Sequence, residues 1–221
     1  MKEVKEFYTE LGYKKLAERK KPEYTEKELL YLKKVLGKRK KVLDVGCGFG
    51  RFTIPLAKMG YEMQGIDITP ILIKNAKNIS KKAKTDIKFI VGDMRKLPYK
   101  DNEFDAIICM WSVFIELINK KDQLRALSEM IRVLRLEGMA IIEMPLPMKD
   151  SVNYPDIGDF FKLNKKTHIV SGKINWKPTR LAYNQDKKTL IQLMKSLKIA
   201  KCKIFIDKFG GRNRLFLQFW K

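Results

Sequence analysis

The chain has 221 residues, 45% of them apolar, and 47 basic residues against 25 acidic ones give it a formal net charge of +22. This apolar content excludes a disordered or fibrous protein, and the length suits one α/β domain with at most a small addition. No apolar run of about 18 residues indicates a membrane-spanning helix, and the charged first residues differ from the apolar stretch of a signal peptide. We therefore expect a soluble, cytoplasmic protein without a membrane partner, either a monomer or a homodimer.

Cysteine and histidine are scarce in this chain. Cys47, Cys109 and Cys202 are far apart and form no C-x-x-C pair, and His168 is the single histidine. Disulfide frameworks and zinc sites need paired or clustered ligands. We expect neither a disulfide framework nor a bound metal.

The positive charge is concentrated on the two flanks of the chain. Basic residues exceed acidic ones by 7 over residues 1–41, by 3 over residues 42–144 and by 12 over residues 145–221. Such an excess attracts a polyanion such as RNA, or an acidic small substrate. However, 37 of the 47 cations are lysines, and no aromatic residues are interleaved with them in a basic motif. We therefore attribute the charge to a general abundance of lysine on a solvated surface, and keep binding to RNA as the alternative.

The apolar pattern predicts alternating helices and strands. A helix over residues 26–36 is expected first, with Thr25 as a candidate cap and Gly37 at its end. Short apolar strands follow at 42–45, 61–68, 87–91, 104–110 and 139–144, with helices at 52–59, 71–83 and 123–134. This alternation predicts an α/β fold with a doubly wound sheet of five parallel strands and helices on both faces. Ligands of such sheets bind at the carboxyl ends of the strands.

The last third of the chain departs from this alternation. Residues 145–180 contain prolines, glycines and many lysines, and form too long a segment for an ordinary connection. We expect an insertion with short strands, for example at 167–171, which does not extend the sheet. A helix at 186–197 follows, and strands at 203–206 and 214–220 flank Gly210-Gly211 as a closing antiparallel hairpin.

Three successive strand ends carry residues suited to a nucleoside. Residues 44–50 form a D-x-G-x-G-x-G turn, whose glycines allow a ligand to approach the backbone closely. Asp67 ends the second strand and can accept both hydroxyls of a ribose, and Asp93 follows the third strand. Taken singly, Asp67 could equally be a helix cap and Asp93 a turn residue. Together with the glycine turn, they favour a nucleoside site.

These motifs resemble those of the class I S-adenosylmethionine (SAM) dependent methyltransferases. VLDVGCGFG is similar to the family's first motif, GIDIT to its second, VGDMRKLPYKDNEFDAIICM to its adenine-binding and fourth-strand region, and LRLEGMAIIE to its fifth-strand region. They occur in the family's order and spacing over residues 42–144. The resemblance implies a Rossmann-like methyltransferase domain over residues 42–221, an N-terminal helical lid over residues 1–41, and SAM as cofactor. We expect the insertion at residues 145–180 to cover the pocket for the methyl acceptor. S-adenosylhomocysteine (SAH) would be its product, without a metal.

The resemblance also implies a role for each motif residue. Gly46, Gly48 and Gly50 would shape the turn under the methionine part of SAM. Cys47 lies inside that turn, and from this position we expect it to fill a small space at the cofactor site rather than to act as a nucleophile. The other implied contacts are Asp44 to the amino group, Asp67 to the ribose hydroxyls, Asp93 to the adenine amino group, Ile68 and the Met94 backbone to the adenine ring, and Met110 near the sulfonium.

The loop after the fourth strand is where the acceptor of such enzymes approaches. Many relatives have a histidine here, and residues 109–116 contain none. Glu116 is the nearest ionisable candidate for a general base, with a helix-start carboxylate as the alternative, and Trp111 could line the acceptor pocket. The Pro-Cys setting of RNA cytosine-5 methyltransferases and the D/N-P-P-Y/F motif of amino-adenine methyltransferases are both absent.

The sequence thus predicts methyl transfer from SAM to a nitrogen, oxygen or carbon nucleophile of a small molecule. The positive charge of the protein would favour an anionic small molecule as this acceptor. Attack on an already activated methyl group depends mainly on alignment, so the prediction assigns no catalytic residue. The alternatives are an RNA methyltransferase that uses the basic flanks and a non-catalytic SAM-binding scaffold.

Overall fold

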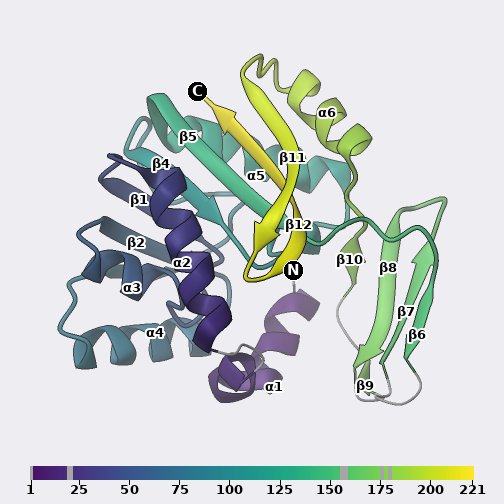
Figure 1. The fold of residues 1–221 in the computed structure, drawn as a ribbon, viewed down its shortest axis with the longest axis horizontal. Coiled ribbons are helices and arrows are strands. Elements are labelled where there is room, and N and C mark those ends of the chain that lie inside the picture. Colours follow the sequence, from purple (N-terminus) through teal and green to yellow (C-terminus); the bar gives the residue numbers. More distant parts are fainter. Residues whose placement is uncertain (1, 19–21, 155–158, 175–176, 179–180) are drawn as a thin grey trace.

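A seven-stranded sheet forms the centre of the protein. The computed structural model describes residues 2–18, 22–154, 159–174, 177–178 and 181–221. In it the sheet has the strand order β11-β12-β5-β4-β1-β2-β3 (Figure 1). The parallel strands are β1 (Lys41–Val45), β2 (Glu62–Asp67), β3 (Lys88–Val91), β4 (Phe104–Cys109) and β5 (Leu134–Met144).

A C-terminal hairpin completes this sheet. β12 (Arg212–Trp220) pairs antiparallel with β5, and β11 (Cys202–Phe209) pairs antiparallel with β12. Gly210 and Gly211, which join these two strands, have φ values of +57° and +79°, which glycine adopts without steric cost. The predicted doubly wound α/β fold with a closing hairpin is confirmed.

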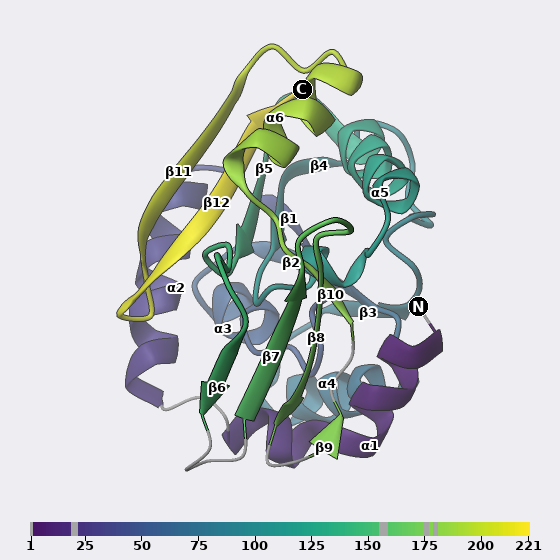
Figure 2. The ribbon, with the colours of Figure 1, turned by 90° about the vertical axis from the view of Figure 1, so that its right-hand side faces the viewer.

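Helices cover both faces of the sheet, because side chains along each strand alternate between two apolar clusters. Leu32 of α2 and Leu56 of α3 pack against one face with Phe216, whereas Leu127 of α5 and Leu193 of α6 pack against the other. Figure 2 shows α2 and α3 on one side of the strands and α5 on the other. The helices are α2 (Pro22–Leu36), α3 (Thr53–Lys58), α4 (Pro70–Lys82), α5 (Lys120–Val133) and α6 (Lys187–Ser196).

The N-terminal region is helical. α1 (Lys2–Glu18) is interrupted at Gly12, whose φ of 66° and ψ of 165° are not helical, and packs beside α4. The prediction that Thr25 caps a helix at 26–36 was wrong: α2 begins at Pro22, and Thr25 lies within its first turns. Proline suits a first helical turn because its φ is already fixed near the helical value and its missing N–H is not needed there.

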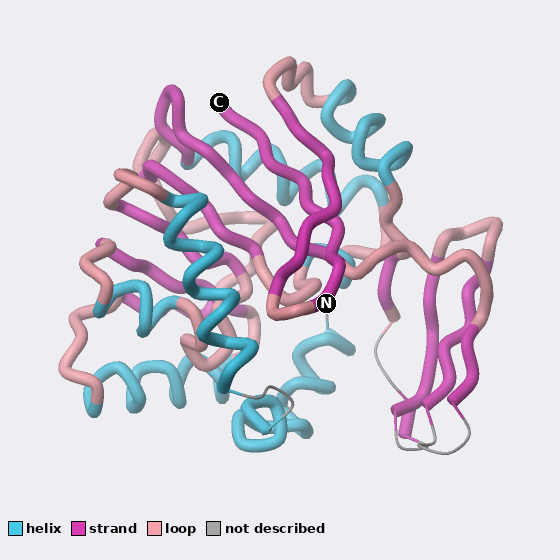
Figure 3. Tube along the Cα trace, in the orientation of Figure 1, coloured by secondary structure: helices cyan, strands magenta, loops and turns pink. Residues whose placement is uncertain are grey.

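A second, antiparallel sheet lies beside the first (Figure 3). It consists of β6 (Val152–Tyr154), β7 (Asp159–Asn164), β8 (Ile169–Ile174), β9 (Lys177–Pro178) and β10 (Ala182–Tyr183). The strand expected at 167–171 corresponds to β8. Residues 155–158, 175–176 and 179–180 of the predicted insertion, and residues 1 and 19–21 of the predicted lid, lie outside the described residues.

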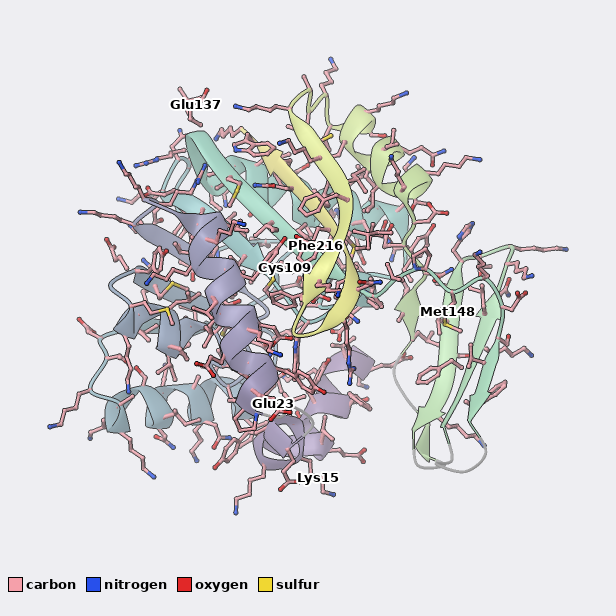
Figure 4. The ribbon with its side chains drawn as sticks, viewed as in Figure 1. Lys15, Glu23, Cys109, Glu137, Met148 and Phe216 are labelled. Atoms are coloured by element: carbon pink, nitrogen blue, oxygen red, sulfur yellow. The ribbon has the colours of Figure 1, made fainter. Side chains whose placement is uncertain are left out.

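Two hydrogen bonds join the chain where it enters and leaves the second sheet. The backbone N–H of Met148 donates to the side-chain oxygen of Asn184 at 2.8 Å, and the Asn184 amide donates to the Met148 carbonyl at 2.9 Å. Met148 lies next to the second sheet (Figure 4). Among the described residues, no helix is both long and apolar enough to cross a membrane.

Candidate functional site

A pocket opens at the carboxyl ends of β1, β2, β3 and β4, where ligands of parallel sheets bind. It contains about 810 Å³ of space, part of which is open to solvent. Val4, Tyr8 and Leu16 of α1 form one wall. Eight of the predicted site residues line it: Asp44, Gly46, Cys47, Gly48, Asp67, Ile68, Met94 and Met110.

The glycine turn after β1 needs glycine for three different reasons. All three glycines have positive φ, between +55° and +85°. A Cβ on Gly46 would lie 2.4 Å from the Val113 side chain, and one on Gly50 would lie 2.9 Å from Ile54. Gly48 faces open space, with no atom closer than 4.0 Å to its Cβ position. Gly48 therefore presents bare backbone to the pocket, whereas Gly50, which does not line the pocket, lets the turn pack onto α3.

Asp67 ends β2 with its carboxylate held in place by two backbone groups. The N–H of Gly48 donates to one oxygen at 2.9 Å, and the N–H of Thr69 donates to the other at 2.8 Å. Burial raises the pKa of Asp67 to about 6, although these hydrogen bonds oppose the rise. The N-cap of α4 is Thr69 rather than Asp67. Asp67 is therefore ionised at neutral pH, and each oxygen keeps a lone pair for a hydroxyl group.

Asp44 lies deeper, below the glycine turn, and is 2% exposed. The hydroxyl of Thr53 donates to its carboxylate at 2.7 Å. Burial raises the pKa of Asp44 to about 7, with Thr53 opposing the rise and the charge of Asp67 adding to it. A cationic amino group in the pocket would stabilise the ionised carboxylate.

The two buried cysteines are poor nucleophiles. Burial raises the pKa of both the Cys47 and the Cys109 thiol well above the usual value. Cys109 lies in the central sheet (Figure 4), and Cys47 sits in the turn next to Gly65. A thiol that stays protonated at neutral pH has little reactivity, so both residues act as small apolar side chains.

Asp93 is not brought into the pocket. Its carboxylate pairs with the guanidinium of Arg95 at 2.6 Å, and Arg95 also bonds Asp122 at 2.7 Å. Burial alone would raise the pKa of Asp93, but the hydrogen bonds from Arg95 outweigh it and hold that pKa below its usual value. The neighbouring Gly92 and Met94 line the pocket instead. Asp93 also accepts a hydrogen bond from the backbone N–H of Arg95 at 2.9 Å. This contact is typical of a turn residue, which was the alternative role of Asp93 in the sequence analysis.

Glu116 lies in a short 3-10 helix, Phe114–Glu116, at the edge of the pocket. It is 5% exposed, and the Tyr8 hydroxyl of α1 donates to its carboxylate at 2.7 Å. This bond spans 108 positions in the chain and joins the N-terminal helix to the loop after β4.

Four charged residues at or beside the pocket, which form two ion pairs, were not identified in the sequence analysis. Arg51, directly after the glycine turn, lines the pocket and pairs with the buried Glu28 of α2. Glu143 of β5 and Arg214 of β12 form a second ion pair next to the loop after β4. Arg51 could have been identified from its position directly after the last glycine. The two members of each ion pair, however, are 23 and 71 positions apart in the chain, so no local signal links them. Among the described residues, no group of three or more potential metal ligands occurs.

A family profile described as a methyltransferase domain matches residues 42–138, which include the glycine turn and Asp67. A protein of Methanocaldococcus jannaschii is 32% identical over 174 residues, which cover 75% of this chain and 70% of that protein. The chain belongs to the class I SAM-dependent methyltransferase family.

Other similar proteins match this chain over a smaller share of their own length, or resemble it in fold alone. A demethylmenaquinone methyltransferase of Renibacterium salmoninarum is 33% identical over 102 residues, 46% of this chain and 40% of that enzyme. The chain thus spans less than half of this relative. The PH0226 protein of Pyrococcus horikoshii OT3 has a TM-score of 0.71 at 24% identity, over 94% of this chain and 92% of its own. A SAM-dependent methyltransferase from Clostridium acetobutylicum has a TM-score of 0.70 at 15% identity, over 94% and 95%.

Proposed function

We propose that this protein transfers the methyl group of SAM to a nitrogen, oxygen or carbon nucleophile of a small molecule. The observation that carries the proposal is the fixed Asp67 carboxylate at the end of β2, facing the same pocket as the bare backbone of Gly48. The Asp67 carboxylate can accept the hydroxyls of a ribose, and the bare backbone of Gly48 leaves room for the chain attached to that ribose. The names of relatives such as the demethylmenaquinone methyltransferase support a small-molecule acceptor.

The pocket residues fit SAM in charge and shape. Asp44 and Asp67 are carboxylates beside positions where the amino group and the ribose hydroxyls would lie, and Ile68 and Met94 offer apolar surface to the adenine ring. Bound SAM supplies a methyl group already activated by the positive sulfonium. The protein's own task is to hold the two reactants in line and keep water out, which can contribute roughly 7 to 11 kcal/mol to the barrier reduction.

We further propose that α1 serves as a lid and that the second sheet bounds the acceptor side of the pocket. Val4, Tyr8 and Leu16 of α1 line the pocket, and Tyr8 bonds Glu116 across it. β10 of the second sheet packs against the 3-10 helix that carries Glu116. An acceptor that reaches the loop after β4 would thus lie between these two elements. Glu116 is the candidate for a base that takes a proton from it.

An RNA methyltransferase is the second candidate, and the basic flanks are the observation that favours it. On the second sheet Lys162, Lys165, Lys166 and Lys173 are exposed. However, Lys165 already pairs with Asp150 at 2.6 Å, and exposed lysines without stacking aromatics are typical of a solvated surface.

A transfer assay with radiolabelled SAM tests the proposal. Pools of small metabolites and bulk tRNA are incubated separately with the protein, and label is traced into each. We expect label in the small-molecule fraction that is lost in the Asp67→Ala variant. Label confined to tRNA would instead support the RNA alternative, and SAM binding without transfer to either pool would support the scaffold.

A further inference from the structure

Ser112 lies between two residues that line the pocket. Trp111 precedes it and Val113 follows it in the loop after β4, and both side chains form part of the pocket wall. A Cβ on Gly46 would lie 2.4 Å from Val113, so Val113 packs directly on the glycine turn. Arg51 packs on the Trp111 ring, with its guanidinium carbon 4.3 Å from the ring centre. The backbone at Ser112 therefore sets the positions of two side chains that a pocket ligand meets.

The loop has a backbone conformation that its own residues do not favour. Trp111 and Ser112 have φ values of +64° and +63°. This left-handed region costs energy for residues with a side chain, because Cβ then comes too close to the following carbonyl oxygen. Neither residue is glycine, asparagine or aspartate, the types that adopt this region routinely. Contacts from outside the loop therefore have to hold it in this conformation.

Those contacts come from β5 and from the C-terminal hairpin. Nη2 of Arg214 in β12 donates to the Ser112 hydroxyl at 2.6 Å, and Nε of the same arginine pairs with Glu143 of β5. Glu143 is fully buried and accepts the backbone N–H of Trp111 at 2.6 Å. Glu143 lies opposite Phe216 in the sheet, so Arg214, two positions earlier, lies on the same face. One guanidinium thus connects a buried carboxylate to the side chain of Ser112.

We propose that Arg214 is a positioning residue for the methyl acceptor, which acts through the Ser112 hydroxyl to hold the Trp111 ring in the pocket wall. The inference rests on the proposed function, because the loop after β4 is where an acceptor would approach. Arg214 is not among the residues that line the pocket, so it acts on the loop and not on the ligand. A guanidinium suits this task because its fork of donors reaches two acceptors at once, whereas a lysine has a single nitrogen. A residue 102 positions further along the chain thus sets the shape of the acceptor side.

Two substitutions in the full chain break this contact and keep both charges of the buried ion pair. Ser112→Ala deletes the hydroxyl and leaves Arg214 with Glu143. Arg214→Lys keeps a cation for Glu143 but gives up the forked geometry that also reaches Ser112. The matched controls are Ser128→Ala and Arg125→Lys, on the exposed side of α5 and outside the pocket wall. Thermal unfolding verifies that each variant is folded, and Ser112→Ala carries the test if Arg214→Lys folds poorly.

The first readout is the position of the Trp111 ring, which needs neither SAM nor an acceptor. Protein labelled with 5-fluorotryptophan gives a fluorine resonance for each of its three tryptophans, and Trp111→Phe identifies the one from Trp111. The shift of that resonance between H2O and D2O measures how far the ring is exposed to solvent. We expect greater exposure in Ser112→Ala and Arg214→Lys, and wild-type exposure in the two controls. Wild-type exposure in Ser112→Ala and Arg214→Lys as well overturns the proposal, whether or not the protein transfers methyl groups.

The second readout separates the acceptor from the cofactor. With the acceptor found in the label assay, kcat/KM should fall about tenfold or more in each variant of the pair, since misplacement by about 1 Å can cost about a hundredfold. The dissociation constant for SAH should stay within about threefold of the wild type, because neither substituted residue lines the pocket.

The double variant tests whether Arg214 acts through Ser112. Arg214→Lys combined with Ser112→Ala should be no worse in kcat/KM than Arg214→Lys alone, since both changes break the same bond. Additive losses, or an SAH affinity that falls as far as kcat/KM, overturn the proposal. If no acceptor takes up label from the wild type, that result contradicts the proposed function instead, and the exposure of the Trp111 ring decides the role of Arg214.

Discussion

Glu143 of β5 accepts a hydrogen bond from the backbone N–H of Trp111 at 2.6 Å, and so ties the loop after β4 to the neighbouring strand. The same carboxylate, which is fully buried, pairs with Arg214 of β12, and Arg214 donates to the Ser112 hydroxyl at 2.6 Å. Trp111 and Ser112 have φ values of +64° and +63°, a left-handed conformation that non-glycine residues adopt at a cost. Two strands therefore hold a strained pair of residues at the mouth of the pocket.

Replacement of this carboxylate should be strongly destabilising. Glu143→Leu leaves Arg214 and the Trp111 N–H without their partner, and loss of one member of a buried ion pair costs about 3–5 kcal/mol of unfolding free energy. Adding Arg214→Met should recover part of that loss, because the uncompensated charge is removed as well. Urea unfolding of the two variants measures both effects. A loss below about 1 kcal/mol for Glu143→Leu would show that the pair does not hold the loop.

The ribose role of Asp67 predicts a loss of cofactor affinity without a loss of fold. Asp67→Ala removes a charged hydrogen-bond acceptor, which is worth roughly 1.5–3 kcal/mol, or about ten- to a hundredfold in the dissociation constant for SAH. Asp86→Ala, which removes an exposed carboxylate that does not line the pocket, is the control. Unchanged SAH affinity for Asp67→Ala in calorimetry would remove Asp67 from the site.

The raised pKa values of Asp44 and Asp67, about 7 and about 6, predict that the free protein loses stability as the pH rises. The folded state binds more protons than the unfolded chain between about pH 4 and pH 7, so the stabilising contribution is complete below pH 4 and lost above pH 7. SAH should oppose this loss, because its amino group favours ionised Asp44. Thermal unfolding at pH 5.5 and pH 8, with and without SAH, measures the effect.

Asp44→Asn is the matching variant for this pH dependence, since its amide is neutral throughout. We expect a weaker decline in the melting temperature of the free variant between the two pH values. An equally steep decline in the variant would assign the pH dependence to other groups.

Removal of the second sheet should separate cofactor binding from transfer. The hydrogen bonds between Met148 and Asn184 hold the two ends of this segment together, so a short glycine linker can replace residues 149–183. The excision also removes Ala182 from its contact with the central apolar cluster. SAH affinity should stay within about threefold of the wild type, because the pocket residues lie outside the excised segment. Transfer to the acceptor found in the label assay should be abolished. A folded variant that keeps transfer but loses SAH would contradict the proposed division of roles.

The basic surface predicts only weak, salt-sensitive retention of RNA. Each phosphate that a protein neutralises adds close to one unit to the slope of log affinity against log salt for a duplex, and somewhat less for a single strand. If the exposed lysines are a solvated surface, tRNA binding should vanish near physiological salt. Filter binding over a salt series measures this. Saturable, sub-micromolar affinity for one RNA, with methyl incorporation into it, would reverse the choice of acceptor.

The central sheet and the residues that line the pocket at its strand ends could be predicted because their signals are local. Asp67 and the glycines follow apolar strands directly, and a parallel sheet brings successive strand ends to one edge. Asp93 shows the limit of this reasoning: its place after β3 is right, but the neighbouring Arg95, only two positions away, engages its carboxylate. A sequence pattern can place a residue at the end of a strand, but it does not predict the rotamer of the side chain or its hydrogen-bond partner.

The ion pairs around the pocket could not be predicted for a different reason. Glu28 lies in α2 and Arg51 in the turn before α3, and Glu143 and Arg214 lie in strands that become neighbours only through the hairpin. Periodicity describes the face of one element at a time, so it does not reveal which charged residues of two elements meet. The early start of α2 at Pro22 likewise followed from local backbone chemistry that the apolar pattern does not include.

The break at Gly12 divides α1 into a half that carries Val4 and Tyr8 and a half that carries Leu16, all three of them on the pocket wall. If α1 is the lid that we propose, Gly12 is the point at which one half would swing away to release SAH while the other half stays in place. Release of SAH would then be limited by the opening of α1 at Gly12 and not by the methyl-transfer step. A residue with less backbone freedom than glycine at position 12 would slow turnover and leave the rate of methyl transfer itself unchanged.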